Sequence, residues 1–196
     1  MSEHSETQAY VVNRDGFPTQ FPTHLHDPQF WEELGRTIAT FGFLEDVLAK
    51  AIFSFTGTRE YREDEIGAAY AKWVPTLERA LSDQLSNLID VYAKAVREHP
   101  RSTITNLDDL TEALREATKL RNVLCHGSWR KPDHLGRSVP FFVNRQKEVF
   151  ETAIGLGFLR QLRQHVVDLI CEVVNTVTHM GWQFPGSFGP GKPIWP

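Results

Sequence analysis

Residues 27–57, DPQFWEELGRTIATFGFLEDVLAKAIFSFTG, carry the pattern that decides the fold. Apolar residues recur there in steps of three and four, which is the spacing of one face of an α-helix. Asp27 is a suitable N-cap and Pro28 suits the first helical position, so the pattern predicts a long amphipathic helix that ends near Gly57. Its apolar face comprises Trp31, Leu34, Ile38, Phe41, Leu44, Leu48, Ile52 and Phe55.

Helical spacing continues beyond this segment and predicts most of the remaining chain. Pro75 and Pro100 bound one predicted helix, because proline suits a first helical turn and stops a helix that reaches it. Asn106 is a suitable N-cap for another, and Gly127 suits the left-handed conformation that often follows a helix. Four long amphipathic helices indicate an all-α fold, an antiparallel helical bundle of four to five helices. Besides the first helix, the long ones are predicted at about 75–99, 107–126 and 149–180, and a shorter one at about 62–73.

Three segments lack this spacing. Residues 1–27 hold no helical period and contain two prolines, which predicts an extended N-terminal arm. Residues 128–147 contain two prolines and a glycine around a β-prone run, which predicts a loop or irregular hairpin inserted in the bundle. Residues 181–196 are rich in glycine, proline and aromatic residues, and we expect a C-terminal arm that packs on a surface. Residues 28–180 then form a single helical domain.

The composition is that of an ordinary globular protein. Of the 196 residues, 41% are apolar and 23% are charged, which is enough apolar content for one core. The net charge of -4 does not indicate nucleic-acid binding by the molecule as a whole. Any contact with RNA is therefore expected from a local basic patch.

No metal, cofactor or membrane is expected. Cys125 and Cys171 lack the paired spacing of a zinc site and fall in apolar helical patterns, so buried free thiols are predicted. His24 and His26 form a pair with no further nearby ligand. No apolar run reaches the roughly 18 residues that span a bilayer, and residues 1–8 lack the layout of a signal peptide. A cytoplasmic location follows as an expectation.

The most informative motif is Arg121-Asn122-Val123-Leu124-Cys125-His126, at the end of the predicted helix 107–126. Histidine is the side chain best suited to take or give a proton near neutral pH. Arginine supplies a permanent planar cation for phosphoryl oxygens. A simpler interpretation also exists, because a histidine in the last helical turn gains from the helix dipole and glycines commonly follow helices.

This motif resembles the signature of the HEPN superfamily, all-α domains of which many are metal-independent endoribonucleases. The resemblance implies a homodimer with a composite Arg/His site that cleaves RNA through attack by the 2′-hydroxyl. His126 would then be the general acid/base, Arg121 the transition-state cation and Asn122 a positioning group. Defence against phage, toxin–antitoxin pairs and stress response are compatible with the family, so an antitoxin or regulatory protein is a further expected partner. Some members carry a tyrosine two residues after the histidine, where this chain has Ser128.

The spacing within the motif constrains how such a site is assembled. Asn122 and His126 are four residues apart and share a helix face. Arg121 and His126 lie about 140° apart around a regular helix. Either the helix loosens at Gly127 and swings His126 round, or two chains form the site at a symmetric interface, as the resemblance implies.

Glu45 is the second informative residue, because it lies inside the apolar stripe of the first helix. A carboxylate at that position is costly unless it is paired, and Arg121 is the natural partner. The pair is either an internal tie between two helices or a means of orienting Arg121, and both can hold together.

Basic residues follow the motif. Five cations lie between Gly127 and Lys147 against the single acidic residue Asp133, with aromatic residues between them. Cations that neutralise phosphates and aromatics that stack on bases are what a single-stranded RNA groove requires. The alternative is a solvated loop whose aromatics, including Phe141 and Phe142, pack inward. The residues predicted to bind RNA are Arg130, Lys131, Arg137, Arg145, Lys147 and Trp129.

Two functions from different classes therefore remain. One is a metal-independent endoribonuclease of HEPN type. The other is a non-catalytic HEPN-like helical dimer that binds a protein or nucleotide partner. A metal-dependent hydrolase is disfavoured, because the predicted helices carry no clustered set of histidine and carboxylate ligands.

Overall fold

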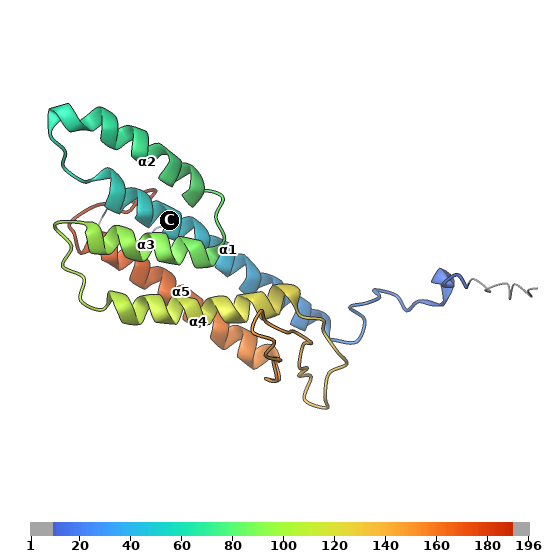
Figure 1. Cartoon of the computed structure of the whole chain (residues 1–196). Helices are drawn as coiled ribbons and strands as arrows, with labels where there is room; N and C mark the ends of the chain where they lie inside the picture. Colours follow the sequence, from blue (N-terminus) through green and yellow to red (C-terminus); the bar gives the residue numbers. More distant parts are fainter. Residues whose placement is uncertain (1–9, 190–196) are drawn as a thin grey trace, which may run out of the picture.

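The long helix predicted at residues 28–57 is the element on which the bundle is built. It is α1, Pro28–Gly57, in a computed structural model that describes residues 10–189. The Asp27 carboxylate accepts a hydrogen bond of 2.8 Å from the Gln29 N–H, and Pro28 occupies the first helical position. Because α1 packs against each of the other four helices, its apolar face lies at the centre of the molecule (Figure 1).

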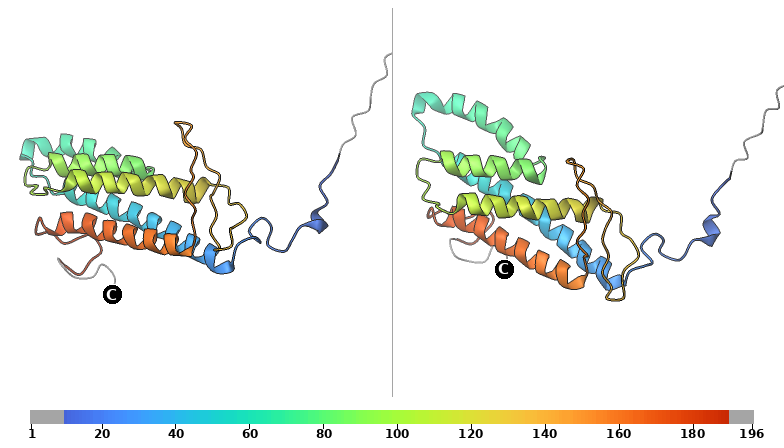
Figure 2. Two further views of the ribbon diagram at one scale, coloured as in Figure 1. Left: turned by 90° about the horizontal axis from the view of Figure 1, so that it is seen from below. Right: turned by 60° about the horizontal axis from the view of Figure 1, so that its bottom comes forward.

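The predicted all-α bundle is confirmed. Residues 10–189 contain five α-helices, two short 3-10 helices and no β-strand. Consecutive helices run in opposite directions, so that α1, α3 and α5 run one way and α2 and α4 the other (Figures 1 and 2). The elements besides α1 are η1 Arg14–Gly16, η2 Glu63–Glu65, α2 Ile66–Ala80, α3 Leu85–Glu98, α4 Leu107–His126 and α5 Leu156–Thr178.

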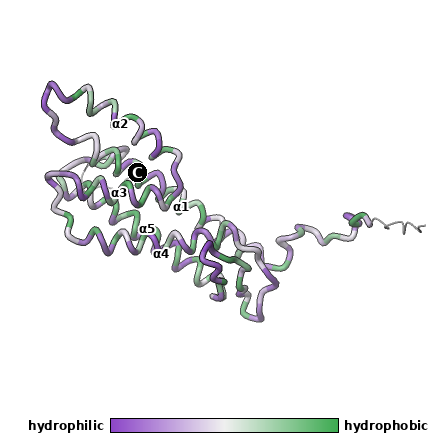
Figure 3. Tube along the Cα trace, in the orientation of Figure 1, coloured by the Kyte–Doolittle hydropathy of each residue, from purple (hydrophilic) through white to green (hydrophobic). Residues whose placement is uncertain are grey.

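The core is formed where the apolar stripes of α1, α3, α4 and α5 meet. Polar and apolar residues alternate along these helices, as expected of helices with one buried face (Figure 3). The Tyr92 hydroxyl donates a hydrogen bond of 3.0 Å to Thr176 Oγ1, so the one polar atom of this buried ring is satisfied. The fully buried side chains include Phe41, Leu44, Leu48, Ile52, Phe55, Ile89, Tyr92, Leu114 and Leu159.

A buried carboxylate joins α1 to α5. Glu33 accepts a hydrogen bond of 2.7 Å from Arg163 Nε, and Arg160 Nε lies 3.5 Å from its other oxygen. Burial by itself raises the pKa of Glu33, but the hydrogen bonds and positive charges of the two arginines outweigh burial and lower it. The carboxylate is therefore ionised and paired, and this pair was not foreseen from the sequence.

The predicted helix from Pro75 to Pro100 is wrong: two helices cover this region. Pro75 lies inside α2, and the chain turns at residues 81–84 before α3 begins. The Ser82 and Asp83 N–H groups both donate to the Arg79 carbonyl, which closes α2, and Gln84 takes an extended conformation ahead of α3. The apolar repeat continues across this turn through Leu81, but that side chain is 76% exposed and packs on no core.

The predicted start of the last helix near Val149 is also wrong, because the inserted hairpin is longer than expected. The hairpin covers residues 128–154 and is held by three isolated antiparallel bridges. Val149 bridges to Val143 and Ile154 bridges to Ser138, which commits residues 149–154 to extended backbone. Helix α5 can begin only after Gly155, its N-cap residue.

Gly127 is needed for close packing, not for a left-handed backbone. Its φ is -70°, so the expected left-handed conformation is absent. A Cβ at this position would lie 2.6 Å from the Val123 carbonyl oxygen and 2.8 Å from Pro140 Cβ. The absence of a side chain therefore lets the hairpin pack directly against the end of α4.

Gly127→Ala is expected to destabilise the fold by about 1–3 kcal/mol, because the backbone or Pro140 must shift to admit the methyl group. Gly35→Ala is the matched control, since a Cβ on this helical glycine meets nothing within 4 Å. That change should be neutral or stabilise by up to about 1 kcal/mol. Urea unfolding of both variants measures the difference, and equal stabilities would contradict the packing role of Gly127.

The two arms differ in how they contact the bundle. The first part of the described N-terminal arm runs away from the helices (Figure 2), whereas the Thr23 carbonyl accepts a hydrogen bond of 2.8 Å from the Trp31 indole of α1. In the C-terminal arm, Phe184 is fully buried, and the Trp182 ring lies 5.0 Å from that of His99. The described part of the C-terminal arm thus packs on the bundle as expected, while residues 1–9 and 190–196 lie outside the described residues.

Both cysteines are free, but the expected burial is wrong. Cys125 and Cys171 are exposed, each directly after a buried apolar residue, Leu124 or Ile170. One residue is a rotation of about 100° around a helix, which is enough to carry a side chain out of the core. Among residues 10–189, no helix is long and apolar enough to cross a membrane.

Candidate active site

The motif forms the last turns of α4, and its histidine is open to solvent. Val123 and Leu124 are buried, Arg121 and Asn122 are partly exposed, and His126 is exposed. The helix stays regular to its end, with the Gly127 N–H donating to the Val123 carbonyl at 2.8 Å. Loosening at Gly127 is therefore not observed, and Arg121 and His126 remain on different sides of α4.

Arg121 meets the carboxylate that the sequence suggested. Its Nη2 lies 3.6 Å from Glu45 Oε1, and both side chains are about one-third exposed, at 32% and 30%. An ion pair of this exposure contributes about 0–1 kcal/mol to stability. The contact is an ion pair and not a hydrogen bond, so the N–H donors of the guanidinium remain for a phosphate to accept from.

The basic hairpin is attached directly to the motif. Ser128 and Phe141 exchange two backbone hydrogen bonds, of 2.9 and 2.8 Å, and so pair the start of the hairpin with its middle. Ser128 is two residues beyond His126. Because Pro140 also packs on Gly127, the hairpin holds a defined position beside the exposed histidine.

The predicted RNA-binding cations are spread along this hairpin. Arg130 and Lys131 follow the Ser128 bridge, and Arg145 and Lys147 lie in the turn at the tip, all four exposed. Arg137 is different, because its Nε and Nη2 bind Asp133 Oδ2 at 3.0 and 2.9 Å.

The Asp133 carboxylate stabilises a second turn of the hairpin, at residues 133–137. Hydrogen bonds from the Arg137 backbone and side chain and from the Leu135 N–H lower the pKa of Asp133 to about 2. Arg137 therefore closes the turn 133–137, and the other four cations have the freer side chains for phosphate contacts.

The aromatic residues of the hairpin divide by face. The Trp129 ring lies 4.9 Å from the Phe30 ring and packs on the core together with Phe142. Trp129 thus packs inward and anchors the hairpin to the start of α1. This is what the alternative interpretation, a solvated loop with inward-packing aromatics, predicted for it. Phe141 points outward at 51% exposure, with the Arg130 guanidinium 5.0 Å from its ring centre. Phe141 was not among the predicted site residues, and the all-apolar run of residues 139–143 gives no signal of which side chains face outward.

His26 joins the N-terminal arm to the hairpin. Its Nε2 shares a hydrogen bond of 3.0 Å with Ser138 Oγ, and its ring stacks on Phe30 at 4.4 Å. Burial lowers the pKa of His26. Among the described residues, no group of three or more histidine, cysteine or acidic side chains is placed to hold a metal ion.

Stability is expected to fall as the pH drops below about 6.5, the ordinary histidine pKa. The pKa of His26 is lowered by burial, and that of His99 by burial and then by Arg59 and Arg101. Between the lowered pKa and 6.5 only the unfolded chain binds these protons, so acid favours unfolding, by up to about 1.4 kcal/mol per pH unit for each histidine.

Urea unfolding at about pH 7.5 and about pH 5.5 measures this loss. His26→Gln keeps a hydrogen-bonding group beside Ser138 but does not titrate, so its loss should be smaller than that of the parent. Equal stability of the parent at the two pH values would contradict the assignment.

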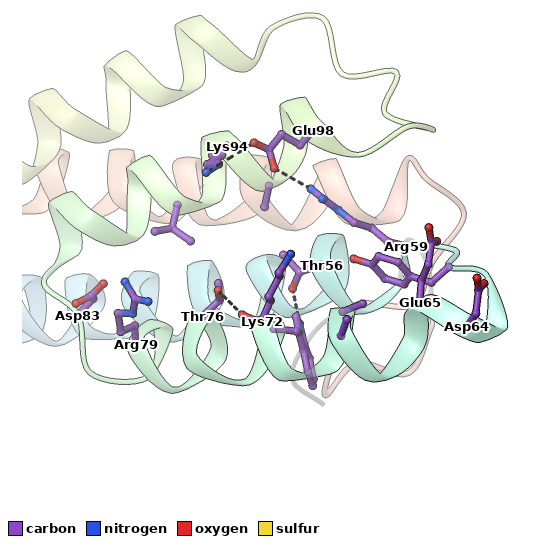
Figure 4. Close-up of a pocket in the computed structure, with 16 residues that line it drawn as sticks. Thr56, Arg59, Asp64, Glu65, Lys72, Thr76, Arg79, Asp83, Lys94 and Glu98 are labelled. Atoms are coloured by element: carbon purple, nitrogen blue, oxygen red, sulfur yellow. Dashed lines mark hydrogen bonds and ion pairs between the residues drawn. The ribbon is translucent and has the colours of Figure 1, made fainter.

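A separate cleft of about 900 Å³ lies between α2 and α3 (Figure 4). Its walls come from the end of α1, the segment that follows it, α2 and α3. The Trp73 Nε1 donates to Thr56 Oγ1 at 2.8 Å, and Glu98 pairs with Arg59 at 3.4 Å and with Lys94 at 3.7 Å. Four cationic and four acidic residues line it, so its charge is balanced and favours no anion.

Comparison with family models, with curated proteins and with solved structures found no match to this chain.

Proposed function

We propose that the protein is a metal-independent endoribonuclease of HEPN type. The observation that carries the proposal is the arrangement at the end of α4, where an exposed histidine and an oriented arginine lie next to a basic hairpin. A histidine transfers protons, an arginine stabilises the phosphoryl oxygens and the hairpin cations neutralise the RNA backbone. These are the parts that cleavage by an internal 2′-hydroxyl needs.

The roles follow from chemistry and position. His126 takes the proton of the attacking 2′-hydroxyl or gives one to the leaving 5′-oxygen. Arg121, held by Glu45, stabilises the charge that develops on the phosphoryl oxygens. Asn122 shares the face of His126 and positions the phosphate or the ribose.

A second copy of the chain completes the site in this proposal. Since α4 is regular to His126, one chain presents its arginine and its histidine in directions about 140° apart. In a twofold-symmetric dimer, Arg121 of one protomer meets His126 of the other and the same site forms twice. The proposed setting is the cytoplasm, with an antitoxin or regulatory protein as a further partner in phage defence, a toxin–antitoxin pair or stress response.

The test is an RNase assay on total tRNA and mRNA in EDTA, with the product ends identified. Attack by the 2′-hydroxyl leaves a 2′,3′-cyclic phosphate on one product and a free 5′-hydroxyl on the other. Cleavage with these ends that resists EDTA is the expected result. Cleavage that EDTA abolishes would replace the proposal with a metal-dependent hydrolase.

A second candidate is a non-catalytic HEPN-like helical dimer that binds a protein or nucleotide partner. The observation that favours it is the cleft between α2 and α3, which belongs to neither α4 nor the hairpin and whose balanced charge suits a protein partner better than a nucleotide anion. This candidate predicts a folded dimer that cleaves no RNA, in which substitutions in the motif change stability alone.

A further inference from the structure

Phe141 is an exposed aromatic residue of the hairpin whose ring does not pack on the core. Along residues 139–143 the side chains alternate, with Val139, Phe141 and Val143 outward and Pro140 buried. The two other aromatics of this part of the hairpin, Trp129 and Phe142, pack on the core. Phe141 therefore contributes little to packing, and half of its surface is in contact with water.

The position of this ring relative to the motif is fixed. Two backbone hydrogen bonds join Phe141 to Ser128, and Pro140 packs against Gly127 at the end of α4. These contacts place Phe141 across from the residue that lies two positions beyond His126. A group bound on the ring would therefore lie near the end of α4, which carries His126.

One cationic group lies directly over the ring. The Arg130 guanidinium lies 5.0 Å from the ring centre, so it covers one face and leaves the other to solvent. Arg130 also lines a hollow of about 370 Å³ with Lys131 and with the paired Asp133 and Arg137. An aromatic face next to cations attracts a flat, electron-rich group that is attached to phosphate, which is the chemistry of a nucleotide in a strand.

We infer that Phe141 and Arg130 bind an unpaired nucleobase next to the scissile phosphate, so that the substrate is single-stranded RNA or an unpaired loop. In an A-form duplex the faces of each base are covered by its neighbours, and a flat ring cannot stack on them. Every base has such a face, so this contact selects unpaired over paired RNA with little preference for sequence. The inference rests on the proposed function and adds the substrate class and its binding residue.

The test measures binding without cleavage, in full-length protein that carries His126→Ala. The probe is a labelled, unstructured RNA of about 12 nucleotides, used alone and annealed to its complement. Adding Phe141→Ala should raise the Kd for the single strand about 5- to 100-fold, and Phe141→Trp should stay within about threefold of the parent. The matched control is Val149→Ala, another exposed apolar residue of the hairpin (55%), which should leave the Kd unchanged.

The salt dependence separates stacking from a general change of the hairpin. Phe141→Ala should keep the slope of log Kd against log salt, because no cation is lost, whereas Lys131→Ala should lower it by about one. An altered slope, or equal losses from Phe141→Ala and Phe141→Trp, would overturn the inference in favour of a structural role.

The remaining outcomes distinguish this inference from the proposed function. Equal Kd values for the parent and Phe141→Ala, or equal affinity for duplex and single strand, would overturn the inference and leave the nuclease proposal standing. If the parent binds no RNA and the wild-type protein cleaves none, both proposals fail.

Discussion

His126→Ala is expected to lower the rate of RNA cleavage in EDTA by about 10²–10⁴-fold, while RNA binding persists. The exposed imidazole at the end of α4 is the group that transfers protons in this proposal, and without it the 2′-hydroxyl has no base and the leaving oxygen no acid. Single-turnover cleavage of a labelled RNA measures the chemical step, and anisotropy with the same RNA measures binding.

His134→Ala is the matched control for this experiment. His134 is an exposed histidine of the same hairpin but lies outside the motif, so its removal should leave the cleavage rate within about twofold. Equal rates for wild type and His126→Ala would refute the assignment of His126. Equal losses of cleavage rate in His126→Ala and His134→Ala would show that the rate responds to any change in this region and not to the motif alone.

Mixing the Arg121→Ala and His126→Ala proteins is expected to restore activity that neither has alone. If each site takes its arginine from one protomer and its histidine from the other, a mixed dimer contains one complete site and one that lacks both groups. With random exchange of subunits, roughly a quarter of the wild-type activity should return. The measurement is cleavage after the two proteins have been mixed at equal concentration under conditions that exchange subunits.

A double variant supplies the control. Mixing Arg121→Ala/His126→Ala with either single variant gives no complete shared site, so no activity should return. If differently tagged subunits exchange and the two single variants still restore nothing, the shared site is wrong. Arg121→Ala should stay folded, because its partly exposed pair with Glu45 is worth only about 0–1 kcal/mol.

Periodicity was sufficient for the helices that form the core and failed where chain direction changes. The helix α1 was predicted to the residue at its start, because Asp27 and Pro28 act locally and their effect needs no tertiary context. The end of α2 was missed, because the apolar repeat runs on through Leu81 into the next helix although the chain turns there. The start of α5 was missed because residues 149–154 pair with distant residues of the hairpin.

The candidate site shows the same division. The contact between Glu45 and Arg121 was predictable, because a carboxylate inside an apolar stripe requires a partner. Composition could not distinguish Trp129, which packs on the core, from Phe141, which is exposed, because both are aromatic residues among cations. Only the pairing of Phe141 with Ser128 decides which hairpin face is turned to solvent. Glu33 was overlooked because it is not in the predicted apolar stripe of α1, and only the packing of α5 against α1 buries it beside Arg160 and Arg163.

The hydrogen bond between His26 and Ser138 limits which segments of this protein can be exchanged independently. It joins two segments that are 112 residues apart in the chain. The indole of Trp31 donates to the Thr23 carbonyl at 2.8 Å and so ties the same arm to α1. The segment that enters α1 and the hairpin are thus one structural unit. A graft of the hairpin onto another bundle, or an exchange of the first 27 residues, has to carry both parts together to keep the hairpin in place.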